Sequence, residues 1–465
     1  MSSTFSGISG ALSALHAARR GLDTAGQNIA NANTAGYSRQ RVDLQAVGGQ
    51  TVPALFATDP GTTGGVAVRG VVRLRNDFLE TRARVEHTQS AYLDAKRQVY
   101  ARIEDVFAEP SDTALQSQLA DFWAGWDDVA NHPGDQAART QLIQRGSVVA
   151  DGLRSAHEGL ESQWRTIRTQ GDAYVRDVND SAATVAGLNR TIQRAQAAGV
   201  PVNELADERD LHLLKLAQLV GATATARPDG TVDVILDGSA LVSGANSRRI
   251  EMVGAGQLAD ATASPVQVRW ADTQGTVVPG GTIAATTEIL NDILPGYAKG
   301  LDDVAFKLAD LINTQHQAGF DVDGAAGKPF YTGTTAATLR VGVTQREVAI
   351  ASSSAAVPAG ARLDGSNADK LSEIGRRIDG ADALYRELVV GLGVAAVATE
   401  RRSEIQASVT ANVDAARVAE SGVNLDEEMT NLLGHQRAYE AASRVLTTLD
   451  GMLDTLINRT GLVGR

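Results

Sequence analysis

Apolar residues at the two ends of the chain recur at alternating steps of three and four residues, and the segment between the ends has a different character. In residues 1–35 this row, called here the N-terminal seam, consists of Phe5, Ile8, Leu12, Leu15, Arg19, Leu22, Gly26 and Ile29. In residues 424–465 the C-terminal seam consists of Leu425, Met429, Leu432, Gln436, Tyr439, Ser443, Leu446, Asp450, Leu453 and Ile457. A period of 3.5 residues is typical of helices that wrap around other helices. Both ends are therefore predicted to be coiled-coil helices that serve assembly.

The last segment carries a second apolar row beside its seam, formed by Val445, Leu449, Met452 and Leu456, and Leu433 adds another apolar position. A helix that is apolar over such a wide arc must pack against more than one neighbour. One neighbour is expected to be the N-terminal helix and the other a helix from an adjacent subunit, with a single intramolecular bundle as the alternative. Because long helices alone are marginally stable in water, both ends are expected to be loose in the monomer and ordered in a polymer. The polar seam residues Arg19, Gln436 and Asp450 are expected to set the register of packing.

The segment after the first helix contains residues that end helices, among them Asn31, Thr34 and Gly36. Residues 38–75 are expected to form a loop with short strands, with 66–74 as the clearest extended stretch. Helical periodicity then predicts four helices, over residues 76–109, 112–130, 135–198 and 203–220. The third is expected to bend near Gly159 or Gly171. Asn203 is expected to cap the fourth, and the charged residues 207–210 are expected to face solvent.

The pattern changes to alternation at residue 221, with runs at 232–236 and 266–270 separated by turn residues. Helix is expected again at 287–319, interrupted at Pro295, and at 366–419, with a strand at 338–343 between them. The predicted fold is mainly α with a smaller β part. Its predicted domains are a terminal coiled coil (1–36 with 424–465), a helical middle (37–220, 286–319 and 366–423) and a small outer β domain (221–285 with 320–365). A chain that goes out and returns in this way makes its two terminal helices antiparallel neighbours.

Composition and residue spacing exclude several functional classes. A net charge of −12 argues against nucleic-acid binding, which requires a basic face. The chain has no cysteine, and its seven histidines show no metal-ligand spacing. We therefore expect no catalytic residues, no metal and no cofactor, and so no enzyme. No apolar run reaches the roughly 20 residues of a membrane span, and no cleaved leader is evident at the start, so any export is expected to proceed without one.

Several segments together resemble one protein family. Residues 27–40, QNIANANTAGYSRQ, are similar to the N-terminal signature of bacterial flagellar rod, hook and hook-associated proteins. Residues 424–433, 436–442, 452–457 and 204–210 resemble the hook-associated members found at the junction between hook and filament. The similar segments are spread along the chain and are dense at its two ends.

The resemblance implies a structural protein that leaves the cytoplasm through the flagellar type III apparatus and polymerises at the hook–filament junction, outside the cell. Its implied partners are further copies of itself, the hook protein, a second hook-associated junction protein, and a cytoplasmic export chaperone on the C-terminal helix. The implied inner layer is a coiled coil of the terminal helices. We assign the hinge between this layer and the next domain to the hinge motif Asn28, Asn31, Asn33, Thr34, Gly36 and Tyr37.

Two alternatives to a junction protein stay open at this point. One is another flagellar axial component, of hook or rod type, and the other is a surface-displayed enzyme. An enzyme would need a site within 221–365, where no acid–base pair or metal spacing is found. The helical pattern of 76–220 and the segment 425–433 argue against a hook or rod protein.

Overall fold

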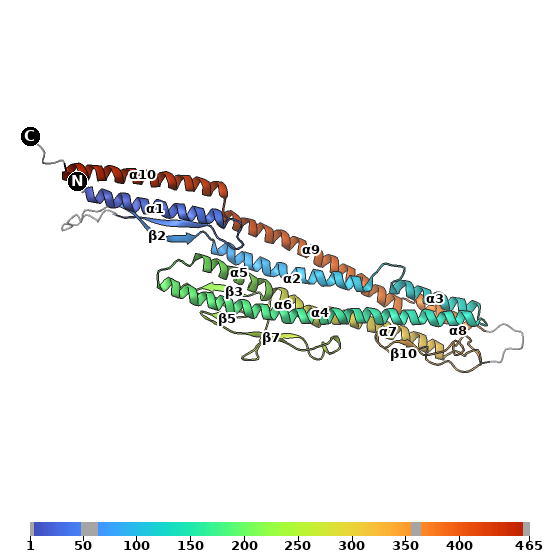
Figure 1. Cartoon of the computed structure of the whole chain (residues 1–465). Coiled ribbons are helices and arrows are strands. Elements are labelled where there is room, and N and C mark those ends of the chain that lie inside the picture. The colour runs from blue at the N-terminus through green and yellow to red at the C-terminus, as the bar shows by residue number, and fades with distance from the viewer. Residues whose placement is uncertain (1–3, 48–63, 355–363, 459–465) are drawn as a thin grey trace, which may run out of the picture.

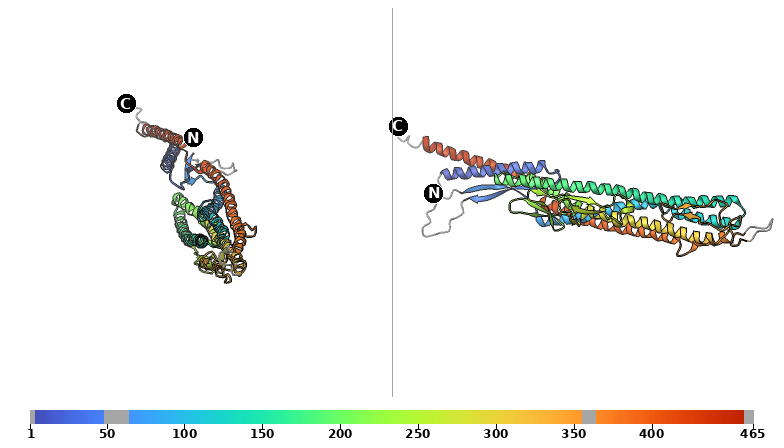
Figure 2. Two further views of the ribbon diagram at one scale, coloured as in Figure 1. Left: turned by 90° about the vertical axis from the view of Figure 1, so that its right-hand side faces the viewer. Right: turned by 90° about the horizontal axis from the view of Figure 1, so that it is seen from below.

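The two chain termini lie at one end of an elongated molecule whose long helices run side by side (Figure 1). The computed structural model describes residues 4–47, 64–354 and 364–458, with the side chains of residues 4–6 left undescribed. Figure 2 shows the molecule end-on in its left view and from below in its right view, where the first and last helices project beyond the main bundle. The predicted antiparallel pairing of the terminal helices is confirmed.

Helices dominate the fold, as predicted. Their bounds are α1 (Thr4–Ala30), α2 (Asp77–Phe107), α3 (Leu115–Asn131), α4 (Gln136–Ala197), α5 (Asn203–Val220), α6 (Gly281–Glu288), α7 (Leu294–Gln317), α8 (Ser366–Ser372), α9 (Ala381–Ser421) and α10 (Leu425–Asn458). Helix α4 continues for 62 residues without a break through Gly159 and Gly171. The two glycines instead leave room for neighbouring side chains, because a Cβ atom at Gly171 would lie 2.8 Å from the sulfur of Met252.

Side-chain caps begin α2 and α4, whereas α3 and α5–α9 start without one. The side chain of Asn76 accepts hydrogen bonds from the backbone N–H groups of Phe78 and Leu79 at the start of α2. The expected cap of α5 is wrong: Asn203 is the first helical residue, and its side chain donates to Gln40 Oε1 and to the carbonyl of Val71. A tertiary contact has taken the place of the local cap.

The strands form small antiparallel sheets. Strands β1 (Gln40–Val47) and β2 (Gly65–Arg73) pair as a hairpin, which confirms the extended stretch predicted there. One sheet has the order β3 (Thr223–Ala226), β4 (Val232–Leu236), β5 (Ser239–Ser243), β6 (Asn246–Ser247), and another has the order β7 (Ile250–Val253), β8 (Gln267–Trp270), β9 (Thr276–Val277).

A separate pair, β10 (Tyr331–Thr332) and β11 (Arg340–Val341), replaces the longer strand predicted at 338–343. Strands from 221–285 and from 320–365 thus belong to different sheets, and the division into three domains stays a prediction.

The helix predicted at 287–319 begins earlier than expected, at Gly281, and contains a π-helical turn at Ile289–Ile293. Pro295 follows in the first turn of α7, where a residue without a backbone N–H is tolerated. The interruption predicted from the proline therefore lies in the residues just before it.

Buried side chains join the elements at the end of the bundle remote from the termini. Phe122 and Trp126 of α3 pack against Phe330, and His316 of α7 packs edge-on against both Trp126 and Phe330. The His316 Nε2 accepts the backbone N–H of Ala349 at 2.9 Å, and its Nδ1 bonds the carbonyl of Lys328. Burial lowers the pKa of His316 to about 4, so the ring is neutral near pH 7.

Candidate assembly site at the chain ends

Helix α1 lies between α10 on one side and the β1–β2 hairpin on the other (Figure 1). The residues that it buries are mostly small, namely Ala11, Ala17, Ala18, Gly21, Thr24, Ala25 and Asn28. A Cβ atom at Gly21 would lie 2.5 Å from the His435 ring, and one at Gly7 would lie 3.4 Å from Leu449. The intrachain contact therefore depends on close approach of α10 to a small-residue face of α1.

This small-residue face is not the N-terminal seam predicted from the sequence. Ile8, Leu15, Leu22 and Ile29 are half-buried, and Leu12 is 45% exposed. The side chain of Phe5 lies outside the described residues. Small residues give weak signals in a hydrophobicity pattern, which is why the contact face of α1 was missed. The seam lies beside the contact rather than in it.

Helix α10 is covered far less than α1. Of its 34 residues, all of which the structure describes, only Glu428 and Ala442 are buried. Leu432, Leu446, Leu449 and Leu453 are half-buried. The other predicted contact residues are exposed, between 37% for Tyr439 and 74% for Ile457: Leu425, Met429, Leu433, Tyr439, Val445, Met452, Leu456 and Ile457. The wide apolar arc of the last helix is thus only partly covered by α1.

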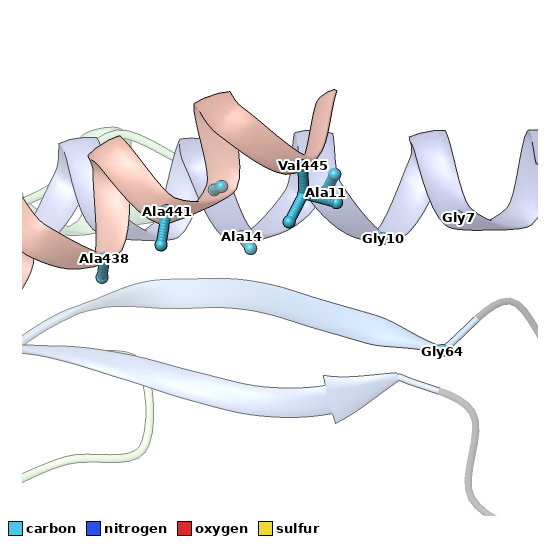
Figure 3. Close-up of a pocket in the computed structure, with 9 residues that line it drawn as sticks. Gly7, Gly10, Ala11, Ala14, Gly64, Ala438, Ala441 and Val445 are labelled. Carbon is cyan, nitrogen blue, oxygen red and sulfur yellow. The ribbon is translucent and has the colours of Figure 1, made fainter. Parts of the chain in front are cut away.

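A shallow apolar groove of about 480 Å³ runs between α1, α10 and the start of β2 (Figure 3). Its lining consists of small residues and one valine, namely Gly7, Gly10, Ala11, Ala14, Gly64, Ala438, Ala441, Ala442 and Val445. The groove adds to the apolar surface that the terminal helices present.

A buried amide, that of Asn28, joins the end of α1 to the residues that follow it and to α10. Its Nδ2 donates to the carbonyl of Gln40 and to Glu428 Oε2, each at 2.9 Å. Its Oδ1 accepts the Tyr37 hydroxyl at 2.8 Å and the Gln40 N–H at 2.9 Å. Burial, and then the negative charges of Asp207, Glu204 and Glu428, raise the pKa of Tyr37 to about 12, so its hydroxyl keeps the proton that it donates.

An ion pair extends this network to the start of α10. The guanidinium of Arg39 bonds Glu428 Oε1 and Glu427 Oε2, both at 2.8 Å. The side chain of Glu428 is only 3% exposed, whereas that of Glu427 is 57% exposed. A buried carboxylate needs partners that satisfy its charge, and Arg39 and Asn28 supply them. Docking of α10 is therefore tied to the 37–40 segment.

A second group of charges joins the 37–40 segment to the helical middle. Asp207 of α5 accepts the backbone N–H of Ser38 at 3.1 Å and pairs with Arg73 at 2.8 Å. Arg75 pairs with Glu80 and Asp210, and Glu80 also pairs with Arg417 of α9 at 3.1 Å. Burial opposes ionisation of Glu80, but Arg75 and Arg417 outweigh it and lower the pKa of this carboxyl.

The hinge motif contains residues of two kinds. Asn28 and Tyr37 belong to the buried network described above. Gly36 has φ +80°, and a Cβ atom there would lie 2.6 Å from Leu211, so glycine is required. Asn31 and Thr34 bond each other locally at 3.2 Å, and Asn33 is exposed. A hinge role for the motif stays a prediction.

The expectation that residues 207–210 face solvent is wrong for two of them. Asp207 and Arg209 are each only 6% exposed. Arg209 donates to Asn189 Oδ1 at 3.0 Å and to the carbonyl of Gly230 at 2.8 Å, and burial, with Arg73 and Arg75 nearby, lowers its pKa to about 10. Partners that lie far away in the sequence make this burial possible, so local spacing gave no sign of it.

Within the described residues, no group of three or more histidine or acidic side chains is placed to hold a metal ion. The same part of the chain has no helix long and apolar enough to cross a membrane. The chemistry at the chain ends is that of packing and of buried polar contacts between segments.

Comparison with protein families matches three segments of the chain. Residues 9–37 match a flagella basal body rod protein model, and residues 415–459 match the C-terminal model of the flagellar basal body rod FlgEFG proteins. Residues 100–331 match the helical domain of the flagellar hook-associated protein FlgK. Together with the terminal helix pair, these matches define a structural component of the bacterial flagellum.

Individual relatives narrow the family. The chain is 30% identical to flagellar hook-associated protein 1 of Bacillus subtilis over 514 aligned positions that cover the whole of both proteins. It is 30% identical to flagellar hook-associated protein 1 of Escherichia coli over 74% of this chain and 63% of that protein. The chain belongs to the flagellar hook-associated protein 1 family. The hook junction protein FlgK of Burkholderia pseudomallei aligns with 54% of the chain and 46% of its own length, at 23% identity and a TM-score of 0.48.

Proposed function

We propose that the chain polymerises through α1 and α10 to form the junction between the flagellar hook and filament. The observation that carries this proposal is the apolar surface of α10, where Met429, Val445 and Met452 are each at least half exposed in the single chain. Each such side chain contributes ~1.5–3 kcal/mol when it is fully buried. Neighbouring copies in a polymer supply that burial.

The same surface supports the proposed partners before and during assembly. An exposed apolar helix is an aggregation hazard in the cytoplasm, so an export chaperone covers α10 until the chain passes through the type III apparatus. Outside the cell, further copies, the hook protein and a second hook-associated junction protein replace the chaperone.

One observation favours an alternative function, that of a hook- or rod-type axial component. The matches of residues 9–37 and 415–459 to rod-protein models fit a hook- or rod-type axial component as well. The match of residues 100–331 to the FlgK helical domain favours a junction protein instead, because it covers the helical bundle that lies between the two segments matched by the rod-protein models.

The proposal is tested by making two apolar positions of α10 polar at places that α1 leaves at least half exposed, without touching the Asn28 network. The test variant carries Val445→Ser and Met452→Ser, at positions 50% and 54% exposed. The matched control carries Val148→Ser and Val278→Ser, which are 49% and 71% exposed and lie outside the terminal helices. Each is expressed in cells that lack their own copy of the gene.

We expect the test variant to be exported and folded but shed into the medium, with hooks that carry no filaments, whereas the control variant supports swimming. Circular dichroism of the purified variants checks that both fold. Normal filaments and swimming with the test variant would refute the proposal.

A further inference from the structure

The contact between α1 and α10 within one chain has a fixed register. Gly7 lies against Leu449 and Gly21 lies against His435, so 14 residues forward along α1 correspond to 14 residues back along α10. The bond between Asn28 and Glu428, seven residues further, keeps the same register. In this register Arg19 lies level with Arg437.

The charged residue of each seam has no partner in this arrangement. Arg19 of the N-terminal seam and Asp450 of the C-terminal seam are both exposed, and neither makes an ion pair with any residue that the structure describes. Asp450 lies 13 residues beyond Arg437, which is about 20 Å along the helix axis at 1.5 Å per residue. The two opposite charges are therefore too far apart to meet within one chain.

The two seams match each other when Arg19 of one copy is placed opposite Asp450 of another in an antiparallel pair. Towards one end, Leu15 and Leu12 then face Leu453 and Ile457. Towards the other end, the seam residues that face each other within one position are Leu22 with Leu446, Gly26 with Ser443, and Ile29 with Tyr439. Apolar residues meet apolar residues, a small residue meets a small residue, and a cation meets an anion.

Other registers fit less well. A shift of one heptad places Arg19 opposite Ser443 or Ile457 and leaves Asp450 against Leu12 or Gly26. Burying an unpaired charge against apolar residues is costly, and a single polar position in a seam is a common device for fixing coiled-coil register. The unmatched charges on the single chain thus select one register between copies.

We propose that the C-terminal seam of one copy packs on the N-terminal seam of a second copy, with the Arg19–Asp450 pair fixing a shift of about 20 Å along the helices. This inference rests on the proposed assembly function and names the surface and register that serve it. The two partners use different faces, and the axial shift moves each copy along the helix direction. Such an interface does not close into a flat ring and builds a helical stack.

Charge reversal tests this contact. The variants are Arg19→Asp, Asp450→Arg and the double variant, with Arg20→Asp as the control because Arg20 is an exposed neighbour outside the seam. Each purified protein is assembled in vitro at low salt, and the critical concentration is measured by sedimentation. We expect each single reversal to raise the critical concentration about tenfold or more, because like charges face each other. The double variant and the Arg20 control should assemble like the unaltered protein.

Mixing the two single variants distinguishes a contact between copies from one within a chain. An equal mixture should assemble near the unaltered critical concentration, because each copy finds complementary charges only on the other variant. Failure of the mixture, with rescue in the double variant, would place the pair within one chain and overturn the inference. Unchanged assembly of Arg19→Asp would also overturn it, while leaving the assembly function intact if the Val445 and Met452 variant still fails. No assembly of the unaltered protein would overturn the inference together with the proposed function on which it rests.

Discussion

Replacing Glu428 by alanine should release α10 from α1 without unfolding the helical middle. The carboxylate accepts one bond from Asn28 and pairs with Arg39. Hydrogen bonds to charged groups contribute about 1.5–3 kcal/mol each, and removal of one partner of a buried pair costs about 3–5 kcal/mol. In the variant, Arg39 still pairs with Glu427, and its side chain is 20% exposed. The pairing and the solvent therefore partly compensate Arg39 for the missing Glu428 carboxylate. We therefore expect the free energy of opening α10 to fall by about 2 kcal/mol, below the range for a fully buried pair.

Hydrogen exchange followed by mass spectrometry measures this opening. A loss of 2 kcal/mol makes amide exchange in α10 about 30-fold faster, while exchange in α4 stays unchanged. Glu427→Ala is the matched control, since its carboxylate pairs with the same arginine but is 57% exposed and contributes at most about 1 kcal/mol. Exchange in α10 within twofold of the unaltered protein, or equal acceleration in α4, would refute the reasoning.

The remaining predictions concern glycines of α1 and the buried histidine. Gly21→Ala places a Cβ atom 2.5 Å from the His435 ring and should weaken docking of α10 by about 1–3 kcal/mol. In Gly26→Ala the added Cβ atom meets nothing within 4 Å, so this variant should stabilise α1 by about 1 kcal/mol. Thermal melting and amide hydrogen exchange of the two variants check the difference. The pKa of His316 is lowered from 6.5 to about 4, so between these values the unfolded chain binds a proton that the folded chain refuses. Stability should therefore fall by about 3 kcal/mol as the pH drops from 6.5 to 4, and a urea titration in which His316→Gln shows the same fall would contradict this.

The features that could be predicted from the sequence are those that depend on the pattern of apolar residues. The long helices, the return of the chain and the pairing of its ends all follow from periodicity, because an amphipathic stripe must be buried whatever covers it. The apolar rows of α10 are exposed or half-buried in the structure, and their role in assembly stays a prediction. The strand predicted at 338–343 is shorter in the structure, where Arg340–Val341 pairs with the two-residue strand Tyr331–Thr332.

Contacts that depend on distant partners were missed. Glu428 and Asp207 are charged residues on helices, which the sequence places in solvent by default, yet Arg39 and Arg73 bury them. The close approach at Gly21 was also invisible, since a glycine in a helix signals only a propensity cost until its neighbour is known.

Because both termini lie at one end of the molecule, the remote end is topologically independent of them (Figure 1). A segment inserted or deleted in the turns at that remote end changes neither the spacing of α1 and α10 nor their mutual register. The remote end can therefore become longer or shorter during evolution while the packing surfaces of α1 and α10 stay unchanged.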